Sequence, residues 1–192
     1  MRNLLISLAT AALVFTGLAA AGLAASPFLL PDPPNIYRTS IFDITAPKGW
    51  VCFREVTESI CRPDTAPPYR AILVAAMKFR NPEMDSLESY AAHVGKPIVR
   101  MDGDGKETIS TFDYARPTVI EGRTWVDAVH HDSEIRGYKT RYLATVTVQV
   151  AILITFSAYE KDFAAYEPTF EKMVRSLNIY QRYNGADETR LD

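Results

Sequence analysis

The stretch YKTRYLATVTVQVAILITFSA, residues 138–158, decides the fold that the sequence predicts. From Tyr142 to Phe156 every even position is apolar, whereas the odd positions include Thr145, Thr147 and Gln149. Alternation with a period of two is typical of a β-strand with one buried face. We therefore expect β-structure throughout this stretch.

The length of the stretch adds a second constraint. A straight strand of about 20 residues would extend ~65 Å at ~3.3 Å per residue. A domain of this size is only about 40 Å across, because its radius of gyration is near ~15 Å. The chain must therefore fold back or bend strongly. A two-residue loop would pair positions of opposite parity and bury Gln149, whereas a three-residue loop centred on Thr147 keeps the even positions on one face. We predict the odd-length turn near residues 146–148, with a strongly bent strand as the alternative.

The two cysteines lie in a predicted hairpin. Residues 50–54 and 59–62 are expected strands, joined by a loop of residues 55–58. This register places Cys52 opposite Cys61, which favours a cross-strand disulfide in an oxidising compartment. A redox pair or a metal site is the alternative, but redox motifs usually hold the cysteines closer and zinc needs about four ligands.

Further strands and two helices complete the predicted domain. Strands are expected at residues 40–45, 69–79, 108–116 and 123–131, the last two joined by Pro117 and Gly122. DSLE, residues 85–88, is a capping box that predicts a helix from Asp85 to about His93. A C-terminal helix is expected in two pieces, 162–166 and 168–177, because Pro168 suits a first helical position. Its packing face consists of apolar residues at helical spacing: Phe163, Tyr166, Phe170, Met173, Val174 and Leu177.

These elements define the fold class. We predict an α+β domain with a mostly antiparallel sheet of about seven to eight strands and two main helices packed on it. Trp50 and Trp125 lie in expected strands and are predicted to be part of the core.

The N-terminal residues 1–25 carry no charge apart from Arg2, are apolar or small from Leu4 onward and end in a segment rich in alanine. This pattern is typical of a secretory signal peptide cleaved after Ala21 or Ala25. An uncleaved signal anchor is the alternative, because roughly 18 uncharged residues can span a bilayer. Residues 26–37 contain four prolines and are expected to be a linker, followed by the domain at 38–180 and a polar tail at 181–192.

We therefore expect a periplasmic or secreted protein. The alternative is a protein anchored in the inner membrane with its domain outside the cytoplasm, where residues 4–25 alone contact the membrane. The net charge is −2, and it becomes −3 when residues 1–25, which carry Arg2 and no acid, are removed. A nucleic-acid-binding protein normally has a basic surface, so nucleic acid is not an expected partner.

Two short motifs contain residue types that bind metals. His130 and Asp132 share one face of a strand, with His131 and Glu134 nearby, but two ligands make a poor site. We expect an exposed strand end there. The DGDG motif at residues 102–105 lacks the further acidic ligands of a calcium loop and predicts a plain turn.

No catalytic constellation is recognisable in the sequence. It contains no nucleophile elbow, zincin helix, phosphate-binding loop or dinucleotide-binding fingerprint. We therefore predict no catalytic, cofactor-binding or metal-binding residues and a protein that is not an enzyme. Tyr180, Arg182 and Tyr183 form a predicted contact surface, because Tyr and Arg are favoured at interfaces. The alternative is a disordered chain end.

Three segments resemble a known group. FDITAPKGW at residues 42–50 resembles the opening strand and turn of the PsbP-like α/β/α sandwich superfamily, and DSLESY at 85–90 resembles its first helix. Residues 138–158 and 163–177 resemble its closing hairpin and helix, although the hairpin lacks the expected Gly or Asn-Gly turn. The superfamily includes extrinsic proteins of photosystem II, a Ran-binding nuclear import factor and small secreted bacterial proteins. The resemblance covers roughly residues 38–180.

The resemblance implies a function in binding, because known members mostly act by binding other proteins. Our hypothesis is a non-catalytic exported accessory protein that binds a protein partner in the cell envelope, for which a membrane complex is one candidate. A carrier of a small apolar ligand is the second hypothesis, and a hydrolase with an unfamiliar site is the third.

Overall fold

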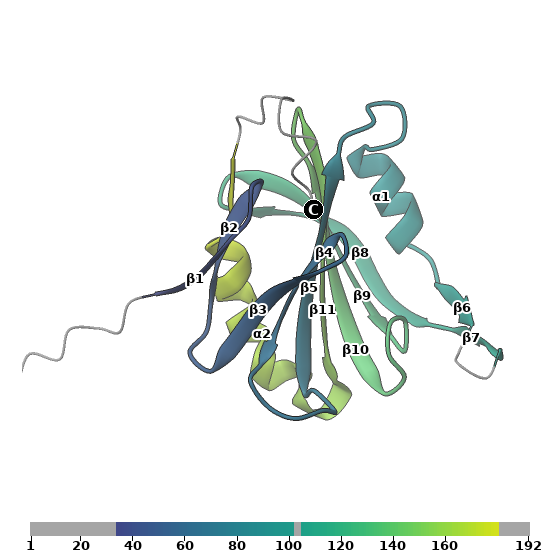
Figure 1. Ribbon diagram of the computed structural model, residues 1–192. Coiled ribbons are helices and arrows are strands. Elements are labelled where there is room, and N and C mark those ends of the chain that lie inside the picture. The colour runs from purple at the N-terminus through teal and green to yellow at the C-terminus, as the bar shows by residue number, and fades with distance from the viewer. Residues whose placement is uncertain (1–33, 102–104, 181–192) are drawn as a thin grey trace, which may run out of the picture. The chain divides into compact units, whose positions relative to one another are not determined.

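The computed structural model describes residues 34–101 and 105–180. Within them, seven strands form the main sheet, and all neighbouring strands are antiparallel (Figure 1). In spatial order the strands are β3 (Trp50–Glu55), β4 (Glu58–Pro63), β5 (Ala71–Phe79), β11 (Val150–Tyr159), β10 (Tyr138–Val146), β9 (Arg123–His131) and β8 (Thr111–Ile120).

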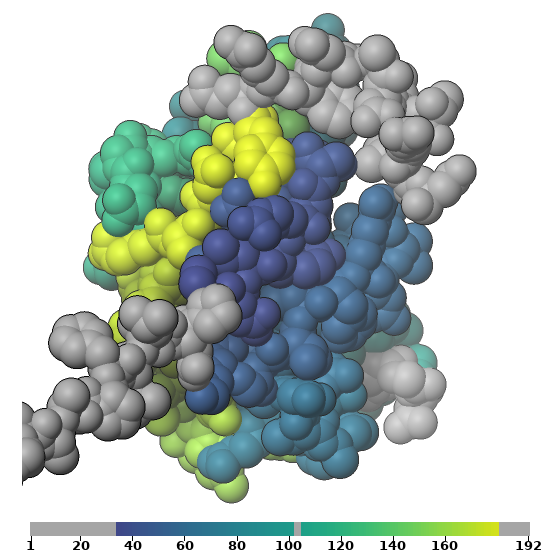
Figure 2. All heavy atoms as spheres, turned by 60° about the vertical axis from the view of Figure 1, so that its left-hand side comes forward, coloured from purple at the N-terminus to yellow at the C-terminus, as the bar shows by residue number. Residues whose placement is uncertain are grey.

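Two smaller sheets and two helices accompany the main sheet. The three-stranded sheet contains β1 (Asn35–Arg38), β2 (Phe42–Ala46) and β12 (Asn178–Ile179), and a short hairpin contains β6 (Val99–Met101) and β7 (Glu107–Ile109). Figure 2 shows the yellow C-terminal residues against the purple strands, where β12 pairs with β2. The helices are α1 (Leu87–Val94) and α2 (Glu160–Arg175).

This architecture confirms the predicted α+β class, with two helices on a mostly antiparallel sheet. The first strand begins at Asn35, so the ordered elements start inside the range that was expected to be a linker. No helix of the described ranges is long and apolar enough to cross a membrane.

The turn between β10 and β11 lies where the sequence predicts it, but the register differs. Thr147, Val148 and Gln149 separate the strands, and the Thr147 N–H donates to the Val150 carbonyl at 2.8 Å. Only Val148 and Gln149 therefore form the loop, and Tyr142 pairs with Thr155. The predicted pairing of even positions with even positions is wrong, and Gln149 is exposed at the loop.

Thr147 explains why this turn needs no glycine. Its side-chain Oγ1 accepts hydrogen bonds from the backbone N–H groups of Gln149 at 3.2 Å and Val150 at 2.9 Å. A threonine hydroxyl that bonds to the backbone two or three residues on stabilises a turn locally.

The pair β10–β11 is buried on both faces, not on one. Leu143, Ile152 and Ile154 belong to the main core with α2, whereas Tyr142 and Ala144 belong to a second core beneath α1. The two helices therefore lie on opposite faces of the main sheet, as in an α/β/α sandwich. A strand covered on both sides needs no strict alternation, so the odd positions Leu143 and Leu153 are apolar as well.

Arg141 is buried because an ion-pair network encloses it. Its guanidinium binds both carboxylate oxygens of Asp127, at 2.8 and 3.0 Å, and Nη1 contacts Glu171 Oε1 at 2.6 Å. Asp127 lies on β9 and Glu171 on α2. The network joins two strands to the helix that covers them.

The C-terminal helix is continuous across Pro168, so the predicted division into two pieces is wrong. Phe163 and Phe170 lie on either side of Pro168, and both contact the ring of Phe156, with centroids 5.5 and 4.8 Å apart. Burial of both rings in one core offsets the hydrogen bond that proline cannot donate. The predicted packing face of this helix is confirmed.

Asp85 does not cap α1, contrary to the predicted capping box. Ser86 is the N-cap, and its Oγ accepts a hydrogen bond from the Ser89 N–H at 3.1 Å. Asp85 is buried and accepts from the Asn81 N–H at 2.8 Å, while Lys78 Nζ lies 2.9 Å from its other oxygen. Burial alone would raise the pKa of Asp85, but the hydrogen bonds from Asn81, Lys78 and Tyr90 outweigh it and lower the pKa.

Pro117 lies within β8 rather than in a turn. This strand is an edge of the main sheet, and a proline there removes no ladder bond when its nitrogen faces outward. The turn to β9 contains Glu121 and Gly122, both with positive φ.

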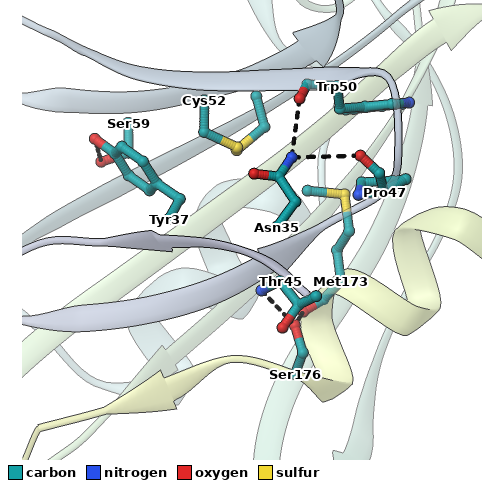
Figure 3. The surroundings of a disulfide bond; sticks show 10 residues. Asn35, Tyr37, Thr45, Pro47, Trp50, Cys52, Ser59, Met173 and Ser176 are labelled. Carbon is teal, nitrogen blue, oxygen red and sulfur yellow. Dashed lines mark hydrogen bonds between the residues drawn. A yellow bond between two sulfur atoms is a disulfide. The ribbon is translucent and has the colours of Figure 1, made fainter. Parts of the chain in front are cut away.

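The hairpin of β3 and β4 has the predicted register, with Cys52 opposite Cys61 and a disulfide between them (Figure 3). The loop is shorter than predicted, because Glu55 pairs with Glu58 and only Val56 and Thr57 remain. Asn35 Nδ2 donates to the Trp50 carbonyl at 3.0 Å, which ties β1 to the start of the hairpin (Figure 3).

Removal of the disulfide is expected to destabilise the domain. The two cysteines are nine residues apart in sequence, and closing a loop of this length corresponds to about 2.5 kcal/mol in the chain-entropy account. The double variant Cys52→Ala/Cys61→Ala should therefore unfold in urea with a free energy lower by about 2–3 kcal/mol. Equal free energies of unfolding for the variant and the parent chain would contradict this expectation.

Candidate binding surface

Within residues 34–101 and 105–180, neither helix covers one face of one half of the main sheet. The core beneath α1 is formed by residues of β9 and β10 with partly buried neighbours from β8 and β11, and Figure 1 shows α1 on the side of β8 to β10. The same face of β3, β4 and β5 carries a groove of about 520 Å³. Its floor consists of half-buried apolar side chains: Phe53, Ile60, Ile72 and Val74. We call this region the open half of the sheet.

The strand register orders the side chains of the open half in three rows. Phe53, Ile60 and Val74 form the central row, because Ile60 pairs with both of the others. Side chains two positions away along each strand point to the same face. The row at one end therefore contains Val51, Arg62 and Ile72, and the row at the other end contains Glu55, Glu58 and Ala76.

Arg62 lies over two aromatic rings at one end of the groove. Its guanidinium carbon is 4.1 Å from the Tyr69 ring centroid and 5.4 Å from that of Phe53. Stacking over an aromatic face is favourable for a guanidinium and leaves its edge N–H groups available to hydrogen-bond an anion.

The opposite end of the groove is acidic and contains two locally unfavourable features, a pair of like charges and a strained backbone conformation. Glu55 and Glu58 are directly opposite each other and exposed, although like charges in a cross-strand pair are destabilising. Val56 has φ of 53° and is 88% exposed, although a β-branched residue rarely adopts the left-handed region. Such local costs are commonly found at functional sites.

The loop between β9 and β10 forms a wall of the groove through Glu134 and Ile135. Tyr142 Oη donates to Glu134 Oε1 at 2.5 Å, and burial together with this bond raises the pKa of Tyr142. Tyr138 Oη donates to the Tyr69 carbonyl at 2.5 Å. These tyrosines hold the loop and the segment before β5 at the edges of the groove.

Comparison with known proteins identifies the architecture. No protein-family model matches the sequence, and no curated protein does. The chain is similar in structure to the cyanobacterial PsbP of Synechocystis sp. PCC 6803, with a TM-score of 0.54 and 10% sequence identity, over 82% of this chain and 99% of that one. The chain has the PsbP-like fold.

Other structures with the PsbP-like fold are similar to this chain at lower TM-scores. The Ran-binding protein Mog1p of Saccharomyces cerevisiae gives 0.44 at 12% identity, over 72% of this chain and 89% of that one. LpqN of Mycobacterium tuberculosis, described as involved in cell envelope biogenesis, gives 0.49 at 12% identity, over 77% and 86%. The chain spans 46% of the length of a longer Bacteroides thetaiotaomicron structure that also matches. Identities this low show a shared fold only.

Of the predicted contact surface of Tyr180, Arg182 and Tyr183, the structure describes Tyr180 alone. Within the PsbP-like domain, Tyr180 extends the pairing of β12 with β2, because its N–H donates to the Ile41 carbonyl at 2.8 Å and its Oη to Asp43 Oδ2 at 2.8 Å. This bond to Asp43 raises the pKa of Tyr180. Arg182 and Tyr183 lie outside the described residues, so the contact role of the tail stays a prediction.

His130 is fully buried, so the expectation of an exposed strand end is wrong for this residue. Its Nε2 is 2.8 Å from the Val94 carbonyl and must donate to it, which leaves Nδ1 to accept from Ser110 Oγ at 3.0 Å. Ser110 Oγ in turn accepts from the Ile98 N–H at 2.8 Å. The neutral imidazole therefore joins β9 to the end of α1 and to the segment that follows it.

The neighbouring His131 lies between two carboxylates. Its Nε2 lies 3.0 Å from Asp113 Oδ2 and its Nδ1 lies 3.2 Å from Glu160 Oε1. Over residues 34–101 and 105–180, no group of three or more His, Cys, Asp or Glu side chains is arranged to hold a metal ion.

The open half is not among the sites predicted from the sequence. The hairpin register that places Cys52 opposite Cys61 also places Phe53 beside Ile60 and Glu55 beside Glu58. The sequence therefore contained two indications of a site here: the paired carboxylates, and the alternation of Glu58, Ile60 and Arg62 along one strand.

Acid is expected to weaken the contacts of His130. Burial lowers the pKa of its imidazole, against the opposing effects of the Val94 carbonyl and Asp113. A depressed pKa means that the stabilisation is complete above the unfolded value of about 6.5 and is lost as the pH falls toward the folded value. The free energy of urea unfolding should fall between about pH 7.5 and about pH 5.

The variant His130→Gln provides the control, because an amide keeps a donor for the Val94 carbonyl without titrating in this range. Its free energy of unfolding should change less over the same pH interval. An equal change in the variant and the parent chain would show that His130 is not the source.

Proposed function

We propose that this chain is a non-catalytic exported accessory protein that binds a protein partner in the cell envelope through the open half of its sheet. The observation that carries the proposal is the groove over β3, β4 and β5, an apolar sheet face that neither helix covers. Such faces on a folded domain commonly mark interaction sites. A membrane complex of the envelope is one candidate partner.

The composition of the open half supports contact with a protein. Phe53, Tyr69 and Arg62 are of the residue types enriched in interface cores. On β3, β4 and β5 the charged side chains stand at the ends of the groove and the apolar ones lie between them, while Glu134 stands in the wall. Interfaces commonly have such an apolar centre with a polar rim.

The proposal that the protein is exported rests on residues 1–25 and on the cysteine pair. The apolar N-terminal pattern is typical of a signal peptide or signal anchor, and a structural disulfide such as Cys52–Cys61 persists in oxidising compartments. The PsbP-like fold also supports a binding role, since the resemblance implies binding rather than catalysis.

The substitution Val74→Arg is expected to prevent partner binding. Val74 is half-buried in the central row of the groove, so an arginine there would fill the groove and place a charge against the apolar contact. Chemical cross-linking in intact cells, followed by affinity purification and mass spectrometry, should recover the partner roughly tenfold less than with the parent chain.

The matched control is Val119→Arg, which makes the same substitution on β8, where the side chain is 67% exposed and lies outside the groove. This variant should recover the partner as the parent chain does. Circular dichroism of both variants checks that they are folded. Equal recovery with Val74→Arg and Val119→Arg would refute the proposed surface.

The groove volume also favours a second candidate, a carrier of a small apolar ligand. About 520 Å³ lies within the ~300–1,000 Å³ typical of small-molecule pockets. Native mass spectrometry of the purified chain distinguishes the two. A co-purified small molecule that is absent from Val74→Arg would favour the carrier over the protein-binding function.

A further inference from the structure

The open half presents its charges in a fixed order along one strand. Arg62, Ile60 and Glu58 are alternate residues of β4 and point to the same face. Ile60 is flanked by Phe53 and Val74, while Glu58 is opposite Glu55. The face therefore changes from a cation to an apolar centre to a pair of carboxylates.

We propose that the partner contributes an extended segment with an acidic, a large apolar and a basic side chain at alternate positions, i, i+2 and i+4. This inference rests on the proposed function and specifies what the partner presents to the same surface. The acidic side chain pairs with Arg62, the apolar one enters the central row, and the basic one lies between Glu55 and Glu58. The order applies in either chain direction.

Arg62 is suited to receive a carboxylate from outside the domain. Within the described residues its guanidinium makes one hydrogen bond, from Nη1 to the Pro63 carbonyl at 3.3 Å, and no ion pair. Tyr69 and Phe53 occupy its flat face. The remaining N–H groups can bind both oxygens of a carboxylate side by side, which is the strongest geometry for such a pair.

The acidic end is suited to receive a cation. Glu55 and Glu58 repel each other across the strand pair, and a lysine or arginine from the partner would remove that repulsion. Charge complementarity of this kind fixes the orientation of a bound segment and excludes segments of the wrong sign. The two ends together therefore select for the order of charges, not only for an apolar residue.

The spacing of the rows favours a strand over a helix. Alternate residues of a strand are about 6.6 Å apart, so Arg62 and Glu58 lie about 13 Å apart along β4. An extended partner covers this distance with four residue steps. An α-helix rises ~1.5 Å per residue and would need about nine. The separation of the two charged positions in a bound sequence therefore reports its conformation.

A random twelve-residue peptide library displayed on phage, selected on the immobilised full chain, tests the inference. The expected result is enrichment of peptides with an acidic, an apolar and a basic residue at successive alternate positions. Selection on Arg62→Glu should remove the preference for the acidic residue. Selection on Glu55→Lys/Glu58→Lys should remove the preference for the basic one. Lys48→Glu, a charge reversal outside the groove lining, is the control and should leave both preferences unchanged.

Three outcomes would overturn the inference: no enrichment of charged residues, a separation of about nine positions as in a helix, or preferences that both groove variants leave unchanged. The proposed function has its own test in the Val74→Arg recovery. Loss of the partner in that experiment without the predicted spacing here would refute the inference and leave the proposed function standing.

Discussion

Burial of the central pair β10–β11 on both faces is the constraint on which the rest of the structure depends. Each face needs its own cover, and α2 with the small sheet of β1, β2 and β12 supplies one of them. The other face is covered by α1, which has eight residues. A helix is about 10 Å wide and spans two or three strands, whereas seven strands at ~4.8 Å are about 29 Å wide. In the described part of the chain, this face of β3 to β5 is therefore left without a helix over it.

The open half is therefore a consequence of the fold, and the hairpin of β3 and β4 sets the order of the apolar and charged side chains on it. The disulfide joins the hairpin on the face that α2 covers. It holds the register that aligns Phe53 with Ile60 on the opposite face. Around this apolar pair, the stacked Arg62 and the opposed Glu55 and Glu58 supply charges of opposite sign. One covalent bond thus supports the proposed binding surface, to which it contributes no side chain.

Local patterns in the sequence predicted most of the strands and helices. The features that they did not predict depend on long-range packing. The register of Cys52 and Cys61 followed from the two short strands predicted around a hairpin loop, and the position of the turn near Thr147 followed from alternation and length. The pairing of odd with even positions between β10 and β11 could not be predicted in this way, because Leu143 and Ala144 are both apolar and suit either face. Asp85 and Ser86 are both residue types that cap helices. Asp85 is buried and accepts from the Asn81 N–H, and Ser86 is the N-cap. The open half was not predicted because Ile72 and Val74 resemble core residues in the sequence. The structure shows that α1 packs over β8 to β11 and does not extend to β5, where these two residues lie.

Site-specific photo-cross-linking in intact cells would show directly whether the open half of the sheet contacts a partner. A photoreactive phenylalanine analogue would replace Phe53 in the groove and, in a separate variant, Val148, which is 89% exposed in the turn between β10 and β11. We expect a discrete adduct with an envelope protein from position 53 and none from position 148. An adduct from position 148 alone would contradict the claim that the open half of the sheet is the binding surface.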